Sequence, residues 1–152
     1  MEKKKSFVMM VQKRWWDGFC RRNKDGKRIH SFVLKGKAPP KEASTILFYV
    51  TKPVGEIAGY ADFLERKVGS PDNMWKEHGE ESVLSSREKY DEFLSGSNIV
   101  SFVRFKELHE AVNTIPLNRV LLSLRVERLS RKGFYIGREI EKDFLDSMKQ
   151  TV

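Results

Sequence analysis

The sequence is short of the residues that form covalent and metal cross-links. Its 152 residues include one cysteine, Cys20, and three histidines. A lone cysteine cannot form an internal disulfide and has no cysteine partners for a zinc cluster. His30, His78 and His109 are far apart and lack the short spacing of helical metal sites. We therefore expect no metal and no cofactor, and we interpret Cys20 as a small apolar residue on a helix.

Long hydrophobic runs are also missing. No apolar stretch approaches the roughly 18 residues that a membrane-spanning helix needs. The run Ser6–Val11 follows a basic start but is too short for the core of a signal peptide. These features predict a cytoplasmic protein with no membrane partner.

The overall composition suits one folded domain over residues 1–152. Hydrophobic residues make up 39% of the chain and charged residues 33%, which is typical of soluble globular proteins. A chain of this length is long enough to bury one apolar core. No internal repeat or low-complexity linker divides it.

Positive charge is concentrated towards the two ends of the chain. The net charge is +8 overall, and it divides into +10 for residues 1–41, −5 for residues 42–118 and +3 for residues 119–152. The two basic ends would form one positive face if they fold together, and such a face favours a polyanionic partner. The alternative is an uneven but merely solubilising surface.

Apolar periodicity predicts strands and helices in mixed order. The predicted strands are Ser6–Val11, Ile29–Lys35, Thr45–Thr51, Val54–Arg66, Asn98–Lys106 and Leu117–Arg128. The predicted helices are Arg14–Arg22, a helix capped by Ser70 and ended by Gly79, a helix opened by the capping box Ser85-Ser-Arg-Glu88, and Arg138–Met148. We expect a helical turn at Leu108–Asn113 and a loop at Gly133–Gly137. Glycines inside the fourth strand, Gly55 and Gly59, indicate a bend, so an α+β domain around a small barrel is expected.

The most distinctive motifs lie between Asp25 and Tyr60. They are the glycine turn with a basic residue Gly26-Lys-Arg28, the strand Ile46–Thr51, Pro53-Val54 and Ile57-Ala-Gly59. This pattern resembles the ASCH domains, which belong to the PUA-like superfamily with the EVE and YTH domains. Val100–Phe105 and Arg131–Ile136 are similar to the closing strands of such a barrel. The chain is also similar to uncharacterised archaeal proteins of this superfamily. The resemblance implies a small PUA-like (ASCH-type) β-barrel with flanking helices.

The chain departs from the ASCH pattern in one strand. Ser31 and Val33 stand where that pattern has glutamate and arginine. Some small ASCH proteins are amidohydrolases with a lysine–glutamate pair and an activated hydroxyl, so the resemblance implies an alternative function: hydrolysis of a nucleoside or an amide-bearing metabolite. Such chemistry needs a base within hydrogen-bond reach of the nucleophile. Without that glutamate we assign no catalytic residue, although Glu56 or Glu65 could replace it.

The resemblance implies RNA or another nucleic acid as the partner, because PUA-like barrels commonly bind RNA or a modified base in a cleft beside the barrel. Binding of this kind needs cations for phosphates and planar groups for bases. The candidate phosphate-binding residues are Arg28, Lys35, Lys37, Lys52, Arg131 and Lys132. Tyr135 or Trp75 is the candidate for stacking on a base.

Each of these residues also has a purely structural interpretation. Arg131 and Lys132 would then lie on a solvated loop over buried Phe134, and Trp75 would pack onto the barrel. A third function is protein interaction, in which the acidic middle of the chain, including Glu80 and Glu81, contacts a basic partner. RNA and DNA both satisfy the requirements above, and no oligomeric state is predicted.

Overall fold

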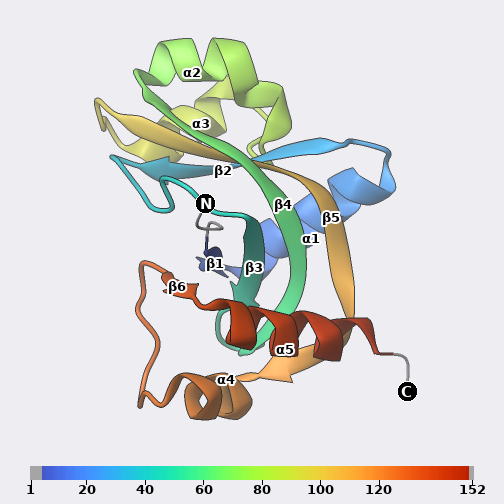
Figure 1. Ribbon diagram of the computed structural model, residues 1–152. Helices are drawn as coiled ribbons and strands as arrows, with labels where there is room; N and C mark the ends of the chain where they lie inside the picture. The colour runs from blue at the N-terminus through green and yellow to red at the C-terminus, as the bar shows by residue number, and fades with distance from the viewer. Residues whose placement is uncertain (1–4, 151–152) are drawn as a thin grey trace.

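The chain folds around one mixed sheet, and this computed structural model describes residues 5–150. Within those residues the elements are β1 (Ser6–Val11), α1 (Lys13–Lys24), β2 (Ile29–Lys35), β3 (Thr45–Val50), β4 (Glu56–Gly69), α2 (Pro71–His78), the 3₁₀ helix η1 (Gly79–Glu81), α3 (Arg87–Leu94), β5 (Val100–Pro116), α4 (Leu117–Leu124), β6 (Phe134–Ile136) and α5 (Arg138–Lys149). Helices α2 and α3 lie together at one end of the sheet, and α4 and α5 lie at the other (Figure 1). The predicted α+β class is confirmed.

The sheet has six strands in the order β2-β5-β4-β3-β1-β6. Strands β1 and β3 pair in parallel, and every other neighbouring pair whose register is resolved is antiparallel. Strands β2 and β6 are therefore the two edges of the sheet. Among residues 5–150 no ladder joins these edges, so the curved sheet is left open between them.

Irregular pairing curves the long strands β4 and β5. They have 14 and 17 residues, and the register of their ladder shifts at three places. Such bulges bend a strand and increase its twist. Gly59 lies at one shift, where an added Cβ would come within 2.4 Å of the carbonyl oxygen of His109. The bend predicted at Gly59 is confirmed, and it gives the sheet the barrel-like curvature seen in Figure 1. Gly55, also predicted inside this strand, precedes β4 and lies in the turn before it.

Alternating side chains of β1 and β3 supply two apolar cores. Phe48 faces α1, where its ring lies 5.2 Å from that of Trp16. Leu47, the preceding residue, joins the opposite core with Phe144 of α5. Each fully buried aromatic or branched side chain contributes roughly 1.5–3 kcal/mol to folding. Helices on both faces therefore hold the sheet in its curved shape.

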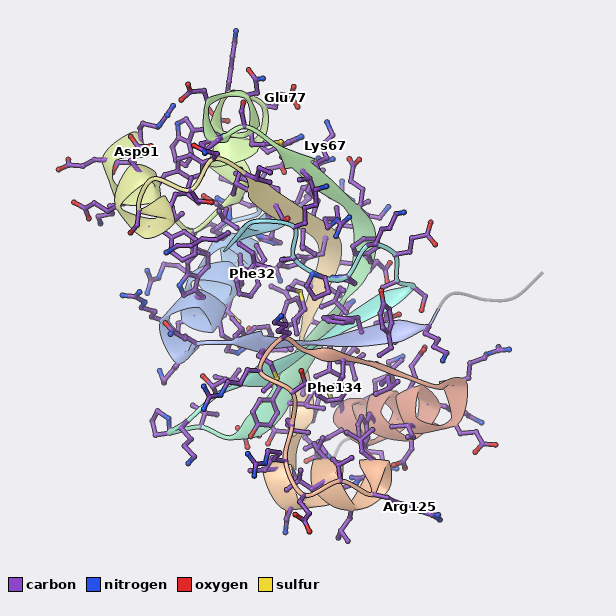
Figure 2. All side chains as sticks on the ribbon, turned by 90° about the vertical axis from the view of Figure 1, so that its left-hand side faces the viewer. Phe32, Lys67, Glu77, Asp91, Arg125 and Phe134 are labelled. Atoms are coloured by element: carbon purple, nitrogen blue, oxygen red, sulfur yellow. The ribbon has the colours of Figure 1, made fainter. Side chains whose placement is uncertain are left out.

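Helices α2, η1 and α3 form a cap, residues 71–94, over β2, β4 and β5. The hydroxyl of Ser70 accepts a hydrogen bond from the backbone N–H of Asn73 at 3.4 Å, so the predicted start of α2 is confirmed. Ser86 rather than Ser85 caps α3, accepting from the N–H of Lys89 at 3.2 Å. The predicted capping box Ser85–Glu88 is therefore wrong: the helix starts one residue later, and its third residue is Lys89, which cannot complete such a box. In Figure 2, Glu77 and Asp91 extend outward from the cap, while Phe32 lies among the side chains between α1 and the cap.

The predicted strand Leu117–Arg128 is wrong, because residues Leu117–Leu124 form the helix α4. Its apolar residues fit the period of a helix as well as the alternation of a strand. The strand interpretation would have buried Leu122 and Val126 with Val120. In the structure only Val120 of these three is buried, and Leu122 is 77% exposed.

Two shorter predictions near the C-terminus are also corrected. Leu108–Asn113 is not a helical turn but the continuation of β5, because β4 supplies a partner strand for it: Tyr60 pairs with His109. The predicted loop Gly133–Gly137 contains the short strand β6, which pairs with β1. In both places a partner distant in the sequence determines the local structure.

The pairing of β1 with β6 brings the two basic ends of the chain together. Ser6, Phe7 and Val8 lie opposite Ile136, Tyr135 and Phe134.

In the described residues, no helix is both long and apolar enough to cross a bilayer.

Candidate nucleic-acid interface

A cavity of about 360 Å³ lies between β1, the end of β2 and the loop that leads into β6. Its lining residues are Met9, Met10, Leu34, Lys35, Lys37, Ala38, Pro39, Arg131 and Lys132. Segments from both ends of the chain therefore form it, at the side where the sheet is open. We call this cavity the basic pocket.

Four of the six cations predicted to bind phosphate line the basic pocket. They are Lys35, Lys37, Arg131 and Lys132, and no carboxylate is among the lining residues. None of the four forms an ion pair with a residue in the range 5–150. Lys35 lies beside the cap, with its Nζ 5.8 Å from the centre of the Phe93 ring. The pocket therefore holds an excess of positive charge that is free to attract an anion.

The loop before β6 places Arg131 and Lys132 at the pocket. The hydroxyl of Ser130 accepts a hydrogen bond from the N–H of Lys132, and the backbone carbonyl of Ser130 accepts one from the N–H of Gly133. Gly133 has a φ of +85°, and a Cβ there would lie 2.5 Å from the carbonyl oxygen of Val8. Only glycine fits this close approach, which brings the loop against β1.

Tyr135 follows this loop on β6 and is 45% exposed. Its ring meets that of Phe7 edge-on at 4.9 Å, and its hydroxyl donates to the carbonyl of Glu42 at 3.0 Å. The ring is thus held in a defined orientation while nearly half of it faces solvent. Such an arrangement can offer a stacking surface.

Four of the eight predicted site residues do not line the basic pocket, and Tyr135 is one of them. Arg28 is exposed in the turn between α1 and β2, and Lys52 is exposed in the turn between β3 and β4. Trp75 is partly buried in the cap, with its ring 4.6 Å from that of Tyr90. The fold thus brings four of the predicted cations to one cavity but places this tryptophan at another.

That other cavity, of about 920 Å³, lies between α1 and the cap and has balanced charge. Its positively charged lining residues are Arg21, Arg22, Lys27 and Lys76, and its negatively charged ones are Asp25, Glu77, Glu80 and Glu81. We call it the balanced cavity. Three of these eight charges, Arg22, Glu77 and Glu81, contact other side chains of the protein.

Glu81 is the most strongly held of these charges. It accepts hydrogen bonds from the Ser31 hydroxyl at 2.8 Å and from Arg104 Nε and Nη2 at 2.9 and 3.0 Å. Arg104 also binds Glu65. Burial raises the pKa of Glu81, but the hydrogen bonds from Arg104 and Ser31 outweigh it, so the pKa lies below its ordinary value. A carboxylate with a lowered pKa is a weak base, and Ser31 is fully buried, so this pair holds the cap rather than presenting a nucleophile.

His30 lies behind the balanced cavity and is fully buried. Its Nδ1 accepts a hydrogen bond from Arg22 Nε at 3.3 Å, while its ring packs near Phe19 and Phe105. Burial, and next the positive charge of Arg22, lower the pKa of His30 to about 4. The imidazole is therefore neutral at physiological pH.

Cys20 is buried on α1, as predicted. Burial, with the nearby Glu110 carboxylate, raises the pKa of its thiol to about 12, so the thiol is unreactive at neutral pH. In the part of the chain that the structure describes, no group of three or more histidine, cysteine, aspartate or glutamate residues is arranged to hold a metal ion.

Sequence reasoning missed the apolar floor of the basic pocket and the charged cluster under the cap. Met9, Met10 and Leu34 lie in strands, where they look like ordinary core residues. Arg104, however, interrupts the apolar run Val100–Phe105. A charged residue inside such a run predicts a side chain of opposite charge in contact with it, because an unpaired buried charge is costly.

Comparison with known proteins identifies the fold. No protein-family model matches the chain. A segment of 71 residues, 47% of the chain, is 37% identical to the ATP synthase subunit alpha of Ureaplasma parvum, but the chain spans only 8% of that protein. This short match does not show a family.

The structural matches extend over nearly the whole chain. The ASCH protein of Zymomonas mobilis superposes with a TM-score of 0.75 and 19% identity, covering 97% of this chain and 98% of that one. Its tyrosine-to-phenylalanine mutant gives a TM-score of 0.76 and 17% identity over 94% and 98% of the two chains. Its serine-to-alanine mutant gives 0.76 and 16% over 96% and 98%. The resemblance seen in the sequence is thus confirmed at the level of the fold: the chain has the fold of the ASCH protein of Zymomonas mobilis.

Proposed function

We propose that the protein binds RNA or another nucleic acid through the basic pocket. The observation that carries this proposal is the convergence of Lys35, Lys37, Arg131 and Lys132 on one cavity without a carboxylate. A cluster of unpaired cations attracts phosphates strongly, because each contact releases a condensed counterion from the nucleic acid. The ASCH-type fold supports the same class of partner.

The pocket and the strand β6 beside it offer surfaces for a base. Its floor includes Met9, Met10 and Leu34, and the half-exposed ring of Tyr135 follows the Arg131–Lys132 loop. In this proposal the phosphates contact the cations, and a base packs against the apolar floor or stacks on Tyr135. Trp75 is a less suitable stacking partner, because its ring packs against Tyr90 in the cap.

The test is fluorescence anisotropy with labelled single-stranded RNA, transfer RNA and DNA between about 50 and about 200 mM salt. Four phosphate contacts on a single strand predict a slope of about −3 for log K against log salt. Replacing Arg131 and Lys132 by alanine should weaken binding roughly tenfold and halve that slope, because two of the four contacts are lost.

A matched control comes from the same loop. Arg125 and Arg128 precede Arg131, are exposed and do not line the pocket, and Arg125 points outward at the end of α4 in Figure 2. Their double alanine variant removes the same charge and should bind almost as wild type does. Wild-type binding that is absent, or that stays constant across the salt series, contradicts the proposed function.

A further inference from the structure

One serine hydroxyl holds both peptide groups that flank Lys37. The Oγ of Ser101, on β5, accepts a hydrogen bond from the N–H of Ala38 at 2.9 Å and donates one to the carbonyl of Gly36 at 2.5 Å. Ser101 is itself fully buried. The backbone on either side of Lys37 is therefore fixed to the beginning of β5.

Two further hydrogen bonds hold the same segment, Gly36–Pro40. Arg66 Nη1, on β4, donates to the carbonyl of Ala38 at 2.9 Å, and the N–H of Gly36 donates to the carbonyl of Ile99 at 2.8 Å. Gly36 has a φ of +70°, which suits glycine at the point where the chain leaves β2. A loop that would otherwise sample many conformations is thus held in one.

The side chain of Lys37, between these two hydrogen-bonded peptide groups, is available to a ligand. Lys37 is exposed, lines the basic pocket and forms no ion pair with any residue between 5 and 150. Ordering a loop costs conformational entropy, and a loop ordered before binding does not lose that entropy when the ligand arrives. On the basis of the proposed function, we infer that Ser101 and Arg66 are positioning residues that hold Lys37 ready to contact a phosphate.

The first experiment compares Ser101→Ala with Lys37→Ala in anisotropy titrations of labelled single-stranded RNA over the salt series. A single phosphate contact contributes about 0.7 to the slope of log K against log salt. Both variants should lower the slope by about that amount and weaken binding roughly threefold at low salt. The double variant should bind as Lys37→Ala does, because both substitutions remove the same contact.

Ser95→Ala is the matched control. Its hydroxyl donates to the carbonyl of Glu92 at 3.0 Å, so it also binds backbone, but it shares no partner with the segment Gly36–Pro40. It should keep the wild-type slope. If wild type binds and Ser101→Ala keeps both its slope and its affinity, the positioning role is overturned while the proposed function stands. If wild type does not bind at all, the proposed function fails first, and the positioning role fails with it.

Arg66 gives an independent route in case Ser101→Ala does not fold. Arg66→Met should lower the slope, whereas Lys67→Met, which removes the charge of a neighbour that pairs with Glu77, should not. In a Lys37→Ala background, Arg66→Met should have no further effect. A full additional loss in that background would mean that Arg66 contacts phosphate directly, which overturns its positioning role.

Discussion

The basic pocket has an excess of positive charge, whereas the larger balanced cavity has none. The basic pocket encloses about 360 Å³ and has four cations with no carboxylate, whereas the balanced cavity encloses about 920 Å³ and has four charges of each sign. A polyanion responds to the excess of positive charge, not to the volume. The smaller cavity is therefore the better candidate for a nucleic-acid site.

The two regions also differ in what their charges already contact. In the balanced cavity Glu81 binds Arg104, Glu77 pairs with Lys67, and Arg22 donates to His30. The four cations of the basic pocket have no such partners in the range 5–150. These three of the eight charges that line the balanced cavity stabilise the fold, whereas all four cations of the basic pocket are available to a ligand.

The largest effect that we expect comes from Arg104→Met. Arg104 is 15% exposed and Glu81 20%, so the substitution leaves a largely buried carboxylate without its main partner. We expect the free energy of unfolding to fall by about 3 kcal/mol in urea titrations. The nucleic-acid affinity of the folded protein should stay within about twofold of wild type.

Arg87→Met is the control for this variant. Arg87 also binds two carboxylates, those of Asp72 and Asp91, but it does so at the exposed surface of the cap. Its loss should hardly move the unfolding midpoint, because solvent screens such pairs. Equal destabilisation by the two variants would remove the distinction between buried and surface charge on which the comparison rests.

The next effect is a loss of stability in acid caused by His30. Its pKa is 6.5 in the unfolded chain and about 4 in the folded protein, so between these values the unfolded state binds the extra proton. Stability is therefore full above about pH 6.5 and falls by about 3 kcal/mol as the pH drops to about 4. Urea titrations across this range measure the change.

His30→Gln should flatten that dependence, because glutamine can still accept from Arg22 but does not titrate. Glu81 contributes in the same direction at lower pH: its folded pKa is lowered, so its stabilisation is lost as it becomes protonated. His109→Gln, at an exposed histidine, is the control and should keep the wild-type curve. A curve that is unchanged in His30→Gln would show that this imidazole is not the group responsible.

Much of the fold could be read from local patterns in the sequence. The alternation in Ile29–Lys35 and the capping serine Ser70 both predicted elements that the structure confirms. The error at Leu117–Leu124 arose because its leucines fit both the helical and the strand period. Only the tertiary structure determines that Leu122 is exposed. Local periodicity is decisive only where the two patterns disagree.

The composition of the basic pocket was less predictable than the fold. Lys35 and Arg131 are nearly a hundred residues apart. Lys35 lies on the edge strand β2 and Arg131 precedes the opposite edge strand β6, and the curvature of the sheet brings both to one cavity. The uneven charge suggested that the ends meet, but it gave no reason to separate Lys35 from Arg28. That separation depends on which end of β2 each residue occupies.

Single substitutions of those two residues sharpen the comparison within the predicted set of cations. Lys35→Ala should weaken RNA binding roughly threefold and lower the salt slope by about 0.7, because one phosphate contact is lost. Arg28→Ala removes the same charge from the turn at the other end of β2, outside the pocket, and should change neither quantity measurably. Lys52→Ala gives a second control. Equal losses in all three variants would indicate a diffuse basic surface in place of a defined site.

The smallest effect is expected from the double variant Arg21→Ala with Lys27→Ala. Both residues are exposed and line the balanced cavity, so their loss makes that cavity acidic without breaking a buried contact. If the excess of unpaired cations determines where the nucleic acid binds, affinity should change by less than about twofold at physiological salt, where charges beyond roughly 8 Å are screened. The loss from the Arg131 and Lys132 double variant should be several times larger. Both double variants remove two positive charges. If Arg21→Ala with Lys27→Ala weakened binding more than the Arg131 and Lys132 double variant, the nucleic acid would bind in the balanced cavity and not in the basic pocket.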